Sequence, residues 1–286
     1  MADIFNSFDK IYCISLPTRK DRWQNCLLQF TKYNILNNVE KFHGIIYNCF
    51  SFNRKQNAHL GCWFSHYSIL KHAQAMRYNK ILILEDDFIF NVEPEDLNLK
   101  LTRCINELPQ NWDLFYLGAY FVKGYDYEAK TNYSENLYKV NTAFCTHSIC
   151  YSKSGIDKMI QCMEKVFLNS SYMILNYESI GWFYVKEFLY ENNCYASKDF
   201  LCGQMKDFSD IEDRIVDYND SFLKPYLTSL IKRQWGQNLI KFQGVKLPGG
   251  IELNGRQIYD DGQKEIDALM EKMSNTYELP PFDMIG

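Results

Sequence analysis

The chain has 286 residues, a formal net charge of −4 and a hydrophobic content of 47%. This length suits one large domain with an appendage, and this hydrophobic content is sufficient for a packed core. The net negative charge argues against a nucleic-acid-binding protein, which usually carries a basic surface, so we expect no nucleic-acid partner.

The cysteines and the N-terminus indicate a compartment. None of the ten cysteines forms a Cys-x-x-Cys pair, which argues against a structural zinc site. The N-terminus lacks the basic start and long apolar stretch of a signal peptide, and no run approaches the roughly 18 apolar residues of a membrane span. We therefore expect a cytoplasmic protein with reduced thiols and no membrane span.

Strands and helices are predicted to alternate from residue 10 to about residue 170. Apolar runs and helical spacing predict, in chain order, a strand at 10–16, a helix at 22–33, a polar loop at 43–58, a helix at 60–78, strands at 81–84, 112–118 and 142–151, and a helix at 155–168 capped by Ser154. This alternation predicts an α/β fold with a mostly parallel central sheet flanked by helices. Ligands of such sheets bind at the carboxyl ends of the strands.

The region after about residue 220 has a different pattern. Leu-Pro-Gly-Gly at 247–250 precedes apolar residues at helical spacing from Ile266 to Met273. We therefore expect a catalytic domain at 1–220 and a partly helical C-terminal extension at 221–286. The extension either packs on the domain or mediates association, which makes it the candidate surface for a homo-oligomer.

Three adjacent carboxylates, Glu85, Asp86 and Asp87, follow the apolar strand at 81–84. Their mutual repulsion requires solvent, cations or a metal, and hard oxygen ligands suit Mn²⁺ or Mg²⁺. In an extended segment Glu85 and Asp87 point the same way, so they can bind one metal and a ribose hydroxyl. The alternative is a solvated acidic turn.

Two further segments carry polar residues suited to a nucleotide. The segment 14–22 places Ser15, Leu16, Arg19 and Arg22 at the end of the first strand, and arginine can hold phosphate with two parallel hydrogen bonds. Alternatively, Asp21 caps the next helix and the cations are solvated.

The segment 61–72 places Ser65, His66 and Lys71 on the second helix. We expect Ser65 and His66 in its first turns, near free backbone N–H groups that could contact a phosphate or sugar. The alternative is that His66 is a packed structural residue.

In order and spacing, these segments resemble glycosyltransferase family 25, which includes lipooligosaccharide and collagen galactosyltransferases. The matching segments are 14–22, 61–71, 81–87, 112–118, 147–152, 203–204 and 208–209. The resemblance implies a GT-A fold, a UDP-sugar donor, often UDP-galactose, Mn²⁺ (or Mg²⁺) and inversion at the sugar carbon. The donor-binding residues then expected are Ser15, Leu16, Arg19, Arg22, Ser65, His66, Lys71, Glu85 and Asp86, with Asp87 and Glu85 as metal ligands.

The chain departs from the family pattern where a base is expected. An Asp is common in that family near 176–182, where this chain has Asn176, Glu178 and Gly181. Inversion requires a base that deprotonates the acceptor hydroxyl, and Asp or Glu is the usual choice. Glu178 is our candidate and Asp199 the reserve, although each could be an ordinary surface carboxylate. The aromatic residues 182–184 are a candidate acceptor platform.

These features predict an enzyme that moves a hexose from a UDP-sugar to a hydroxyl of a glycan, peptide or lipid-linked acceptor. A second hypothesis is a catalytically inactive nucleotide-sugar-binding or assembly protein on the same fold, motivated by the departure near Glu178 and by the unmatched extension. A third is a metal-dependent phosphohydrolase, which the acidic triplet alone suggests and for which a second cluster of His and Asp is missing.

Overall fold

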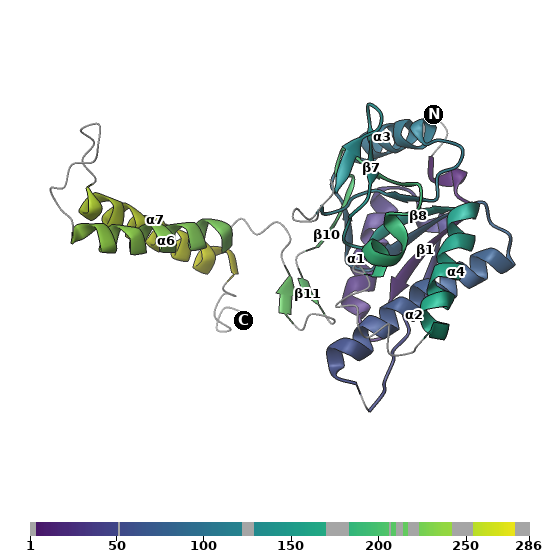
Figure 1. Ribbon diagram of the computed structural model, residues 1–286, viewed down its shortest axis with the longest axis horizontal. Helices are drawn as coiled ribbons and strands as arrows, with labels where there is room; N and C mark the ends of the chain where they lie inside the picture. Colours follow the sequence, from purple (N-terminus) through teal and green to yellow (C-terminus); the bar gives the residue numbers. More distant parts are fainter. Residues whose placement is uncertain are drawn as a thin grey trace, which may run out of the picture. The chain divides into compact units, whose positions relative to one another are not determined.

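A computed structural model describes residues 4–50, 52–121, 129–169, 183–205, 207–209, 214–216, 223–241 and 254–277 (Figure 1). The chain divides into two compact units, residues 1–216 and 217–286. No helix in the described ranges is both long and apolar enough to cross a lipid bilayer.

The first unit alternates helices and strands. Its described helical segments are η1 (Ile4–Ser7), α1 (Lys20–Lys32), η2 (Leu36–Asn38), α2 (Arg54–Ala75), α3 (Pro94–Glu107), α4 (Lys153–Asn169) and a π-helical turn, η4 (Val185–Leu189). Its described strands are β1 (Lys10–Ser15), β2 (Val39–His43), β3 (Lys80–Glu85), β4 (Phe88–Phe90), β5 (Leu114–Tyr116), β6 (Lys130–Asn132), β7 (Leu137–Val140), β8 (Ser148–Ser152), β9 (Cys194–Ser197), β10 (Cys202–Gln204), β11 (Asp207–Ser209) and β12 (Arg214–Val216).

Eight of these strands form the central sheet, in the order β2-β1-β3-β8-β5-β9-β7-β6. Strands β2, β1 and β3 are parallel, β8 is antiparallel to both β3 and β5, and β9 is parallel to β5. Because β7 is antiparallel to both β9 and β6, six of the eight strands run in one direction. The expected α/β fold with a mostly parallel central sheet flanked by helices is confirmed.

Helices cover both faces of this sheet, because its central strands are apolar on both sides. Along β3, Ile81 and Ile83 belong to a core with α2 and α4, whereas Leu82 and Leu84 belong to a core with α1 and α3. Figure 1 shows α2 and α4 side by side, and the two helices are in contact. Two smaller pairs, β4 with β10 and β11 with β12, lie outside the large sheet.

Three departures from the sequence prediction have an identifiable local cause. Helix α2 begins at Arg54 rather than residue 60, because Asn53 and Gln56 form a reciprocal capping box. Strand β8 begins only at Ser148, because Cys145 has a φ of 79° and cannot continue an extended strand. The cap of α4 is Ser152, whose Oγ accepts a hydrogen bond from the Gly155 N–H at 3.1 Å.

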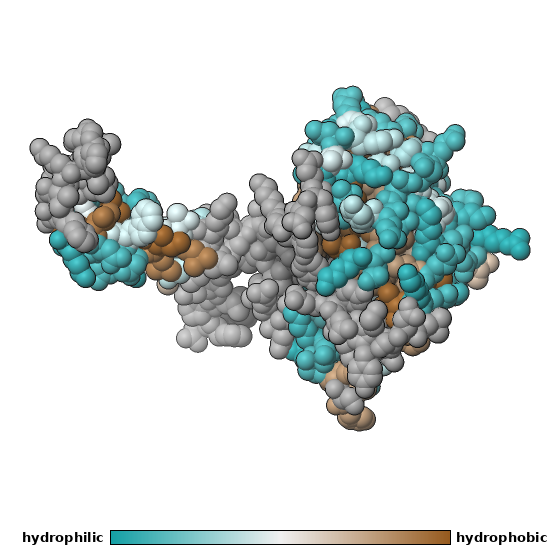
Figure 2. All heavy atoms as spheres, viewed as in Figure 1, coloured by the Kyte–Doolittle hydropathy of each residue, from teal (hydrophilic) through white to brown (hydrophobic). Residues whose placement is uncertain are grey.

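The second unit contains two helices, α6 (Leu223–Ile240) and α7 (Gly255–Tyr277). They pack so closely that a Cβ on Gly236 would clash with the Tyr259 backbone nitrogen. On α6, Leu227, Ile231 and Trp235 recur every four residues and are exposed. Figure 2 shows apolar side chains on the visible face of this unit. The helical pattern expected at 266–273 lies within α7, whereas α6 was not predicted.

We expect a chain that ends at Val216 to fold without the second unit. Both cores flanking the central sheet are built from residues of the first unit, so the truncation removes no strand of that sheet. The melting temperature of the 1–216 chain should therefore lie within a few degrees of that of the full-length protein, measured by circular dichroism. A molten or insoluble product would show that residues 217–286 complete the core.

Candidate functional site

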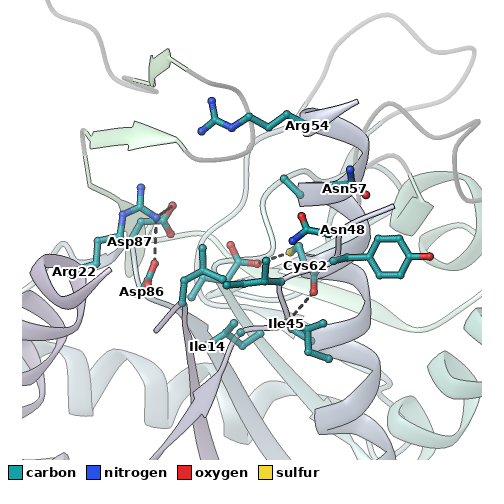
Figure 3. Close-up of a pocket in the computed structure, with 17 residues that line it drawn as sticks. Ile14, Arg22, Ile45, Asn48, Arg54, Asn57, Cys62, Asp86 and Asp87 are labelled. Atoms are coloured by element: carbon teal, nitrogen blue, oxygen red, sulfur yellow. Dashed lines mark hydrogen bonds and ion pairs between the residues drawn. The ribbon is translucent and has the colours of Figure 1, made fainter. Parts of the chain in front are cut away.

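A cavity of about 490 Å³ lies at the carboxyl ends of the parallel strands β2, β1 and β3. Five segments line it: Ile14 and Leu16 at the end of β1, Arg22 of α1, the loop 44–48 after β2, the first half of α2, and the acidic triplet after β3. Figure 3 shows Arg22, Asp86 and Asp87 on one side of the cavity and α2, with Arg54 and Asn57, on the other. The cavity therefore occupies the position where open α/β sheets bind ligands.

Arg22 of α1 neutralises part of the acidic triplet. Its Nη1 lies 3.1 Å from Asp86 Oδ1 and 3.8 Å from Asp87 Oδ2, and its side chain is 9% exposed. The chain turns after Glu85, so the triplet does not continue as an extended strand, but all three carboxylates line the cavity. One buried guanidinium thus faces two of three clustered carboxylates.

The triplet retains capacity for a cation. Burial and the neighbouring Glu85 carboxylate raise the pKa of Asp87 to about 7, although Arg22 opposes this. Asp87 Oδ2 accepts a hydrogen bond from Gln204 at 3.2 Å, whereas its buried Oδ1 has no hydrogen-bond partner in the described part of the chain. Burial also raises the pKa of Asp86. A buried, unpartnered carboxylate oxygen beside two further carboxylates fits a hard divalent cation.

Glu85 is held from two sides. Its Oε1 lies 3.0 Å from His66 Nε2 and accepts a hydrogen bond from the Thr146 hydroxyl at 2.6 Å. Burial alone would raise the pKa of Glu85, but these two contacts outweigh it, and the pKa is lowered. Glu85 therefore stays ionised at the near-neutral pH at which Asp87 gains or loses its proton.

Replacing Arg22 with leucine is expected to destabilise the cation-free protein by about 3–5 kcal/mol at pH 8, because Asp86 and Asp87 would lose their buried cation. Both carboxylates have raised pKa values, so the loss should be smaller at pH 5, where they bind protons more readily. Urea unfolding at the two pH values, without divalent cations, measures this. Arg22→Lys serves as the charge-retaining control, and an equal loss at both pH values would contradict the pairing.

The first strand and its turn bring some of the expected residues to the cavity. Leu16 and Arg22 line the cavity, whereas Ser15 is buried and does not. Burial raises the pKa of Asp86, and the Ser15 hydroxyl partly opposes that rise. Arg19 does not line it, and its guanidinium pairs with Asp21 at 2.8 Å.

The expected residues of α2 lie differently from the prediction. Because α2 begins at Arg54, Ser65 and His66 lie about three turns into the helix, away from its free N–H groups. The Ser65 hydroxyl lines the cavity but donates to the Gly61 carbonyl and accepts from the Ile45 N–H. His66 is fully buried and contacts Glu85. Lys71 does not line the cavity and pairs with Glu164 of α4 at 3.3 Å.

Only one of the two candidate bases, Asp199, lies in the described part of the chain, and it is not among the residues that line the cavity. Glu178 lies outside the described residues. Asp199 is exposed, and its carboxylate pairs with Lys100 at 2.9 Å. The expectation of an aromatic acceptor platform is wrong for Phe183 and Tyr184, because both side chains are buried in the core. Their apolar surface is taken up by packing.

Sequence reasoning missed the contribution of the loop after β2 and the start of α2. Asn48, Arg54, Asn57 and Cys62 all line the cavity. The Asn57 side chain also binds the backbone of Cys49, which fixes the loop against the helix. Asn53 and Gln56 are spaced as a capping box and could have located the start of this helix in the sequence.

A family model described as bacteriophage T4 neck protein gp13 matches residues 56–286. The chain belongs to that family. The match spans most of the first unit and all of the second, including both helices α6 and α7.

The chain is also similar to curated glycosyltransferases. It is 25% identical over 171 residues to procollagen galactosyltransferase 2 of Homo sapiens, and equally to that of Mus musculus. Each match covers 54% of this chain and 27% of the relative, so the chain spans about a quarter of the length of these relatives.

Three solved structures give more distant matches. A glycosyltransferase involved in the glycosylation of the major capsid of PBCV-1 is 13% identical, with a TM-score of 0.44, and 71% of this chain and 95% of that chain are covered. A197 from STIV is 14% identical, with a TM-score of 0.37 and coverages of 73% and 93%. Mannose-1-phosphate geranyltransferase from Thermus thermophilus is 6% identical, with a TM-score of 0.37 and coverages of 66% and 72%.

Proposed function

We propose that the chain is a glycosyltransferase of the GT-A type that takes a hexose from a UDP-sugar and transfers it to an acceptor hydroxyl. One observation carries the proposal: three carboxylates and a buried arginine line a cavity at the carboxyl ends of three parallel strands. The sequence similarity to procollagen galactosyltransferase 2 supports it and makes galactose the first sugar to test.

The cavity lining suits the parts of a nucleotide-sugar. Ile14, Leu16 and Ile45 give an apolar wall on which a nucleobase can pack. Arg54 is the first residue of α2, and the partial positive charge of the helix N-terminus lies beside it, so this end favours a diphosphate. Asn48 offers a hydrogen-bonding side chain to the ligand, while Asn57 holds the loop 44–48 in place through its bonds to the Cys49 backbone.

The acidic triplet suits the cation that such donors need. Asp87 and Glu85 would hold Mn²⁺ or Mg²⁺, and the ion would neutralise charge that develops on the departing diphosphate. Arg22 and Gln204 fix the position of Asp87, while His66 and Thr146 fix that of Glu85. These contacts preorganise the carboxylates before a donor binds.

The catalytic base and the acceptor are assigned from the sequence. Inversion requires a carboxylate on the face of the sugar opposite the diphosphate, and Glu178 is proposed as this base. The acceptor is proposed to be a glycan, a peptide or a lipid-linked sugar. The proposal places the protein in the cytoplasm, where its ten cysteines stay as thiols.

Binding titrations test the donor assignment. We would titrate UDP, UDP-galactose, UDP-glucose and GDP-mannose into the full-length protein, with and without Mn²⁺, and measure affinity by calorimetry. The proposal requires that uridine ligands bind more tightly than the guanosine ligand and that Mn²⁺ strengthens their binding. Equal binding of all four, or no effect of the cation, would reject it.

The family match favours one alternative, a catalytically inactive assembly protein that uses the same fold. The matching model is named for a neck protein and includes the helical second unit. That unit carries the exposed apolar stripe Leu227, Ile231 and Trp235, which suits self-association. Under this alternative the cavity binds a nucleotide-sugar without turnover, or has lost that role.

Light scattering of the full-length protein distinguishes the alternative from the enzyme. An assembly protein should form a defined oligomer that Trp235→Ser dissociates, and it should release no UDP from any UDP-sugar. Leu28→Ser, which removes an equally exposed apolar side chain from α1, is the matched control. Cation-dependent UDP release by the same sample would reject catalytic inactivity, whatever its oligomeric state.

A further inference from the structure

A second cluster of ligand atoms shares Glu85 with the acidic triplet. Cys62 and His66 are four residues apart on α2, so they share one face of the helix. Glu85, at the end of β3, faces both of them. Its Oε1 lies 3.8 Å from Cys62 Sγ and 3.0 Å from His66 Nε2, and the three ligand atoms all lie within 4.8 Å of one another.

We propose that Cys62, His66 and Glu85 form a binding site for Zn²⁺ or a divalent ion of similar softness. A tetrahedral zinc ion with ordinary bond lengths separates its ligand atoms by roughly 3.3–3.6 Å. The two contacts to Glu85, at 3.0 and 3.8 Å, bracket that separation, and the third pair, Cys62 and His66, lies within 4.8 Å. Thiolate and imidazole select this class of ion over Mn²⁺ or Mg²⁺.

The surroundings of the three side chains support a coordinating role. The Thr146 hydroxyl donates to Glu85, an outer contact of the kind that orients metal ligands. His66 is fully buried, and in the described part of the chain its Nδ1 has no hydrogen-bond partner. Coordination through Nε2 would place the ring proton on Nδ1 and would replace the present contact of Nε2 with Glu85 by a bond to the ion.

The site has room for a fourth ligand. Cys62 and Glu85 both line the cavity, whereas His66 lies behind them. Three protein ligands and one open position are typical of zinc sites that exchange water for a substrate oxygen. The open position would therefore take water or an anionic oxygen from a ligand in the cavity. Because this site needs no sugar transfer, it goes beyond the proposed function.

Cobalt substitution tests the site in the full-length protein. Co²⁺ bound by Cys62 should give a near-ultraviolet thiolate-to-metal charge-transfer band and the intense visible bands of four-coordinate cobalt, and Zn²⁺ should displace both. Cys62→Ser should abolish the charge-transfer band and weaken Co²⁺ binding at least about tenfold. His66→Gln should keep a thiolate ligand but weaken binding. Cys162→Ser, at another half-buried cysteine, should change neither.

Absence of the charge-transfer band in the unmodified protein would overturn the proposal, as would a band that survives Cys62→Ser. The unmodified protein decides the first outcome without any variant, so misfolding of a variant cannot hide a negative result. The titration contains no nucleotide. A negative cobalt titration would therefore leave the donor-binding test of the proposed function unaffected. A negative donor-binding test would likewise leave the cobalt titration unaffected.

Discussion

Asp87→Asn is expected to weaken Mn²⁺-dependent UDP binding by about 100-fold or more while the fold stays intact. The substitution removes a cavity-lining carboxylate whose buried Oδ1 has no hydrogen-bond partner in the described residues. An amide is a poor ligand for a hard cation in place of a carboxylate. Calorimetric titration of UDP, with and without Mn²⁺, measures the effect.

The same substitution should change stability with pH in a defined direction. In the folded protein the pKa of Asp87 is about 7, against an ordinary value of 3.8. The folded state thus holds a proton that the unfolded chain has released, so stability falls as pH rises from about 4 to about 7. Without divalent cations, Asp87→Asn should raise the melting temperature at pH 8 more than at pH 5, and Mn²⁺ affinity of the unmodified protein should rise over the same pH range.

Two control variants accompany the Asp87→Asn prediction. Asp157→Asn on α4 does not line the cavity and should leave UDP binding unchanged. Glu85→Gln should reduce binding less than Asp87→Asn if Glu85 mainly contacts the ribose. Unchanged Mn²⁺-dependent affinity in Asp87→Asn would remove this residue from the cation site.

Glu178→Gln is expected to lower the rate of sugar transfer by roughly 10²–10⁴-fold, the usual effect of removing a general base. The affinity for UDP-sugar should stay within a few-fold, because the base contacts the acceptor rather than the nucleotide. The acidic triplet cannot supply this base, since its charge faces the leaving diphosphate. Initial rates with a saturating donor measure the effect.

Asp199→Asn is the matched comparison for the base. Asp199 is exposed and paired with Lys100, so its replacement should leave the rate nearly unchanged. A large loss of rate in Asp199→Asn with none in Glu178→Gln would transfer the role to the reserve residue. Losses in both variants would indicate that neither assignment is sufficient.

The sequence was informative where a feature is local. Apolar runs located β1 and β3, and the position of Glu85, Asp86 and Asp87 after a buried strand predicted carboxylates at a sheet edge. Lys71 could also have been placed, because helical geometry separates it from His66 by about 140° around α2. That angle turns Lys71 away from Glu85 and toward α4.

Contacts between residues far apart in the sequence could not be predicted from local patterns. Arg22 was expected to hold phosphate, but it pairs with Asp86, 64 residues away, and no local pattern records that partner. His66 likewise contacts Glu85 across the gap between α2 and β3. The cluster with Cys62 escaped a search for Cys-x-x-Cys because it contains one cysteine, and its third ligand, Glu85, comes from a strand distant in the sequence.

UDP release from UDP-sugars tests the central claim most directly. The full-length protein would be incubated with UDP-galactose, and then with other UDP-sugars, in the presence and absence of Mn²⁺. The account predicts slow UDP release that requires the cation and is lost in Asp87→Asn. No UDP release from any UDP-sugar, with either Mn²⁺ or Mg²⁺, in a sample that binds UDP would contradict it.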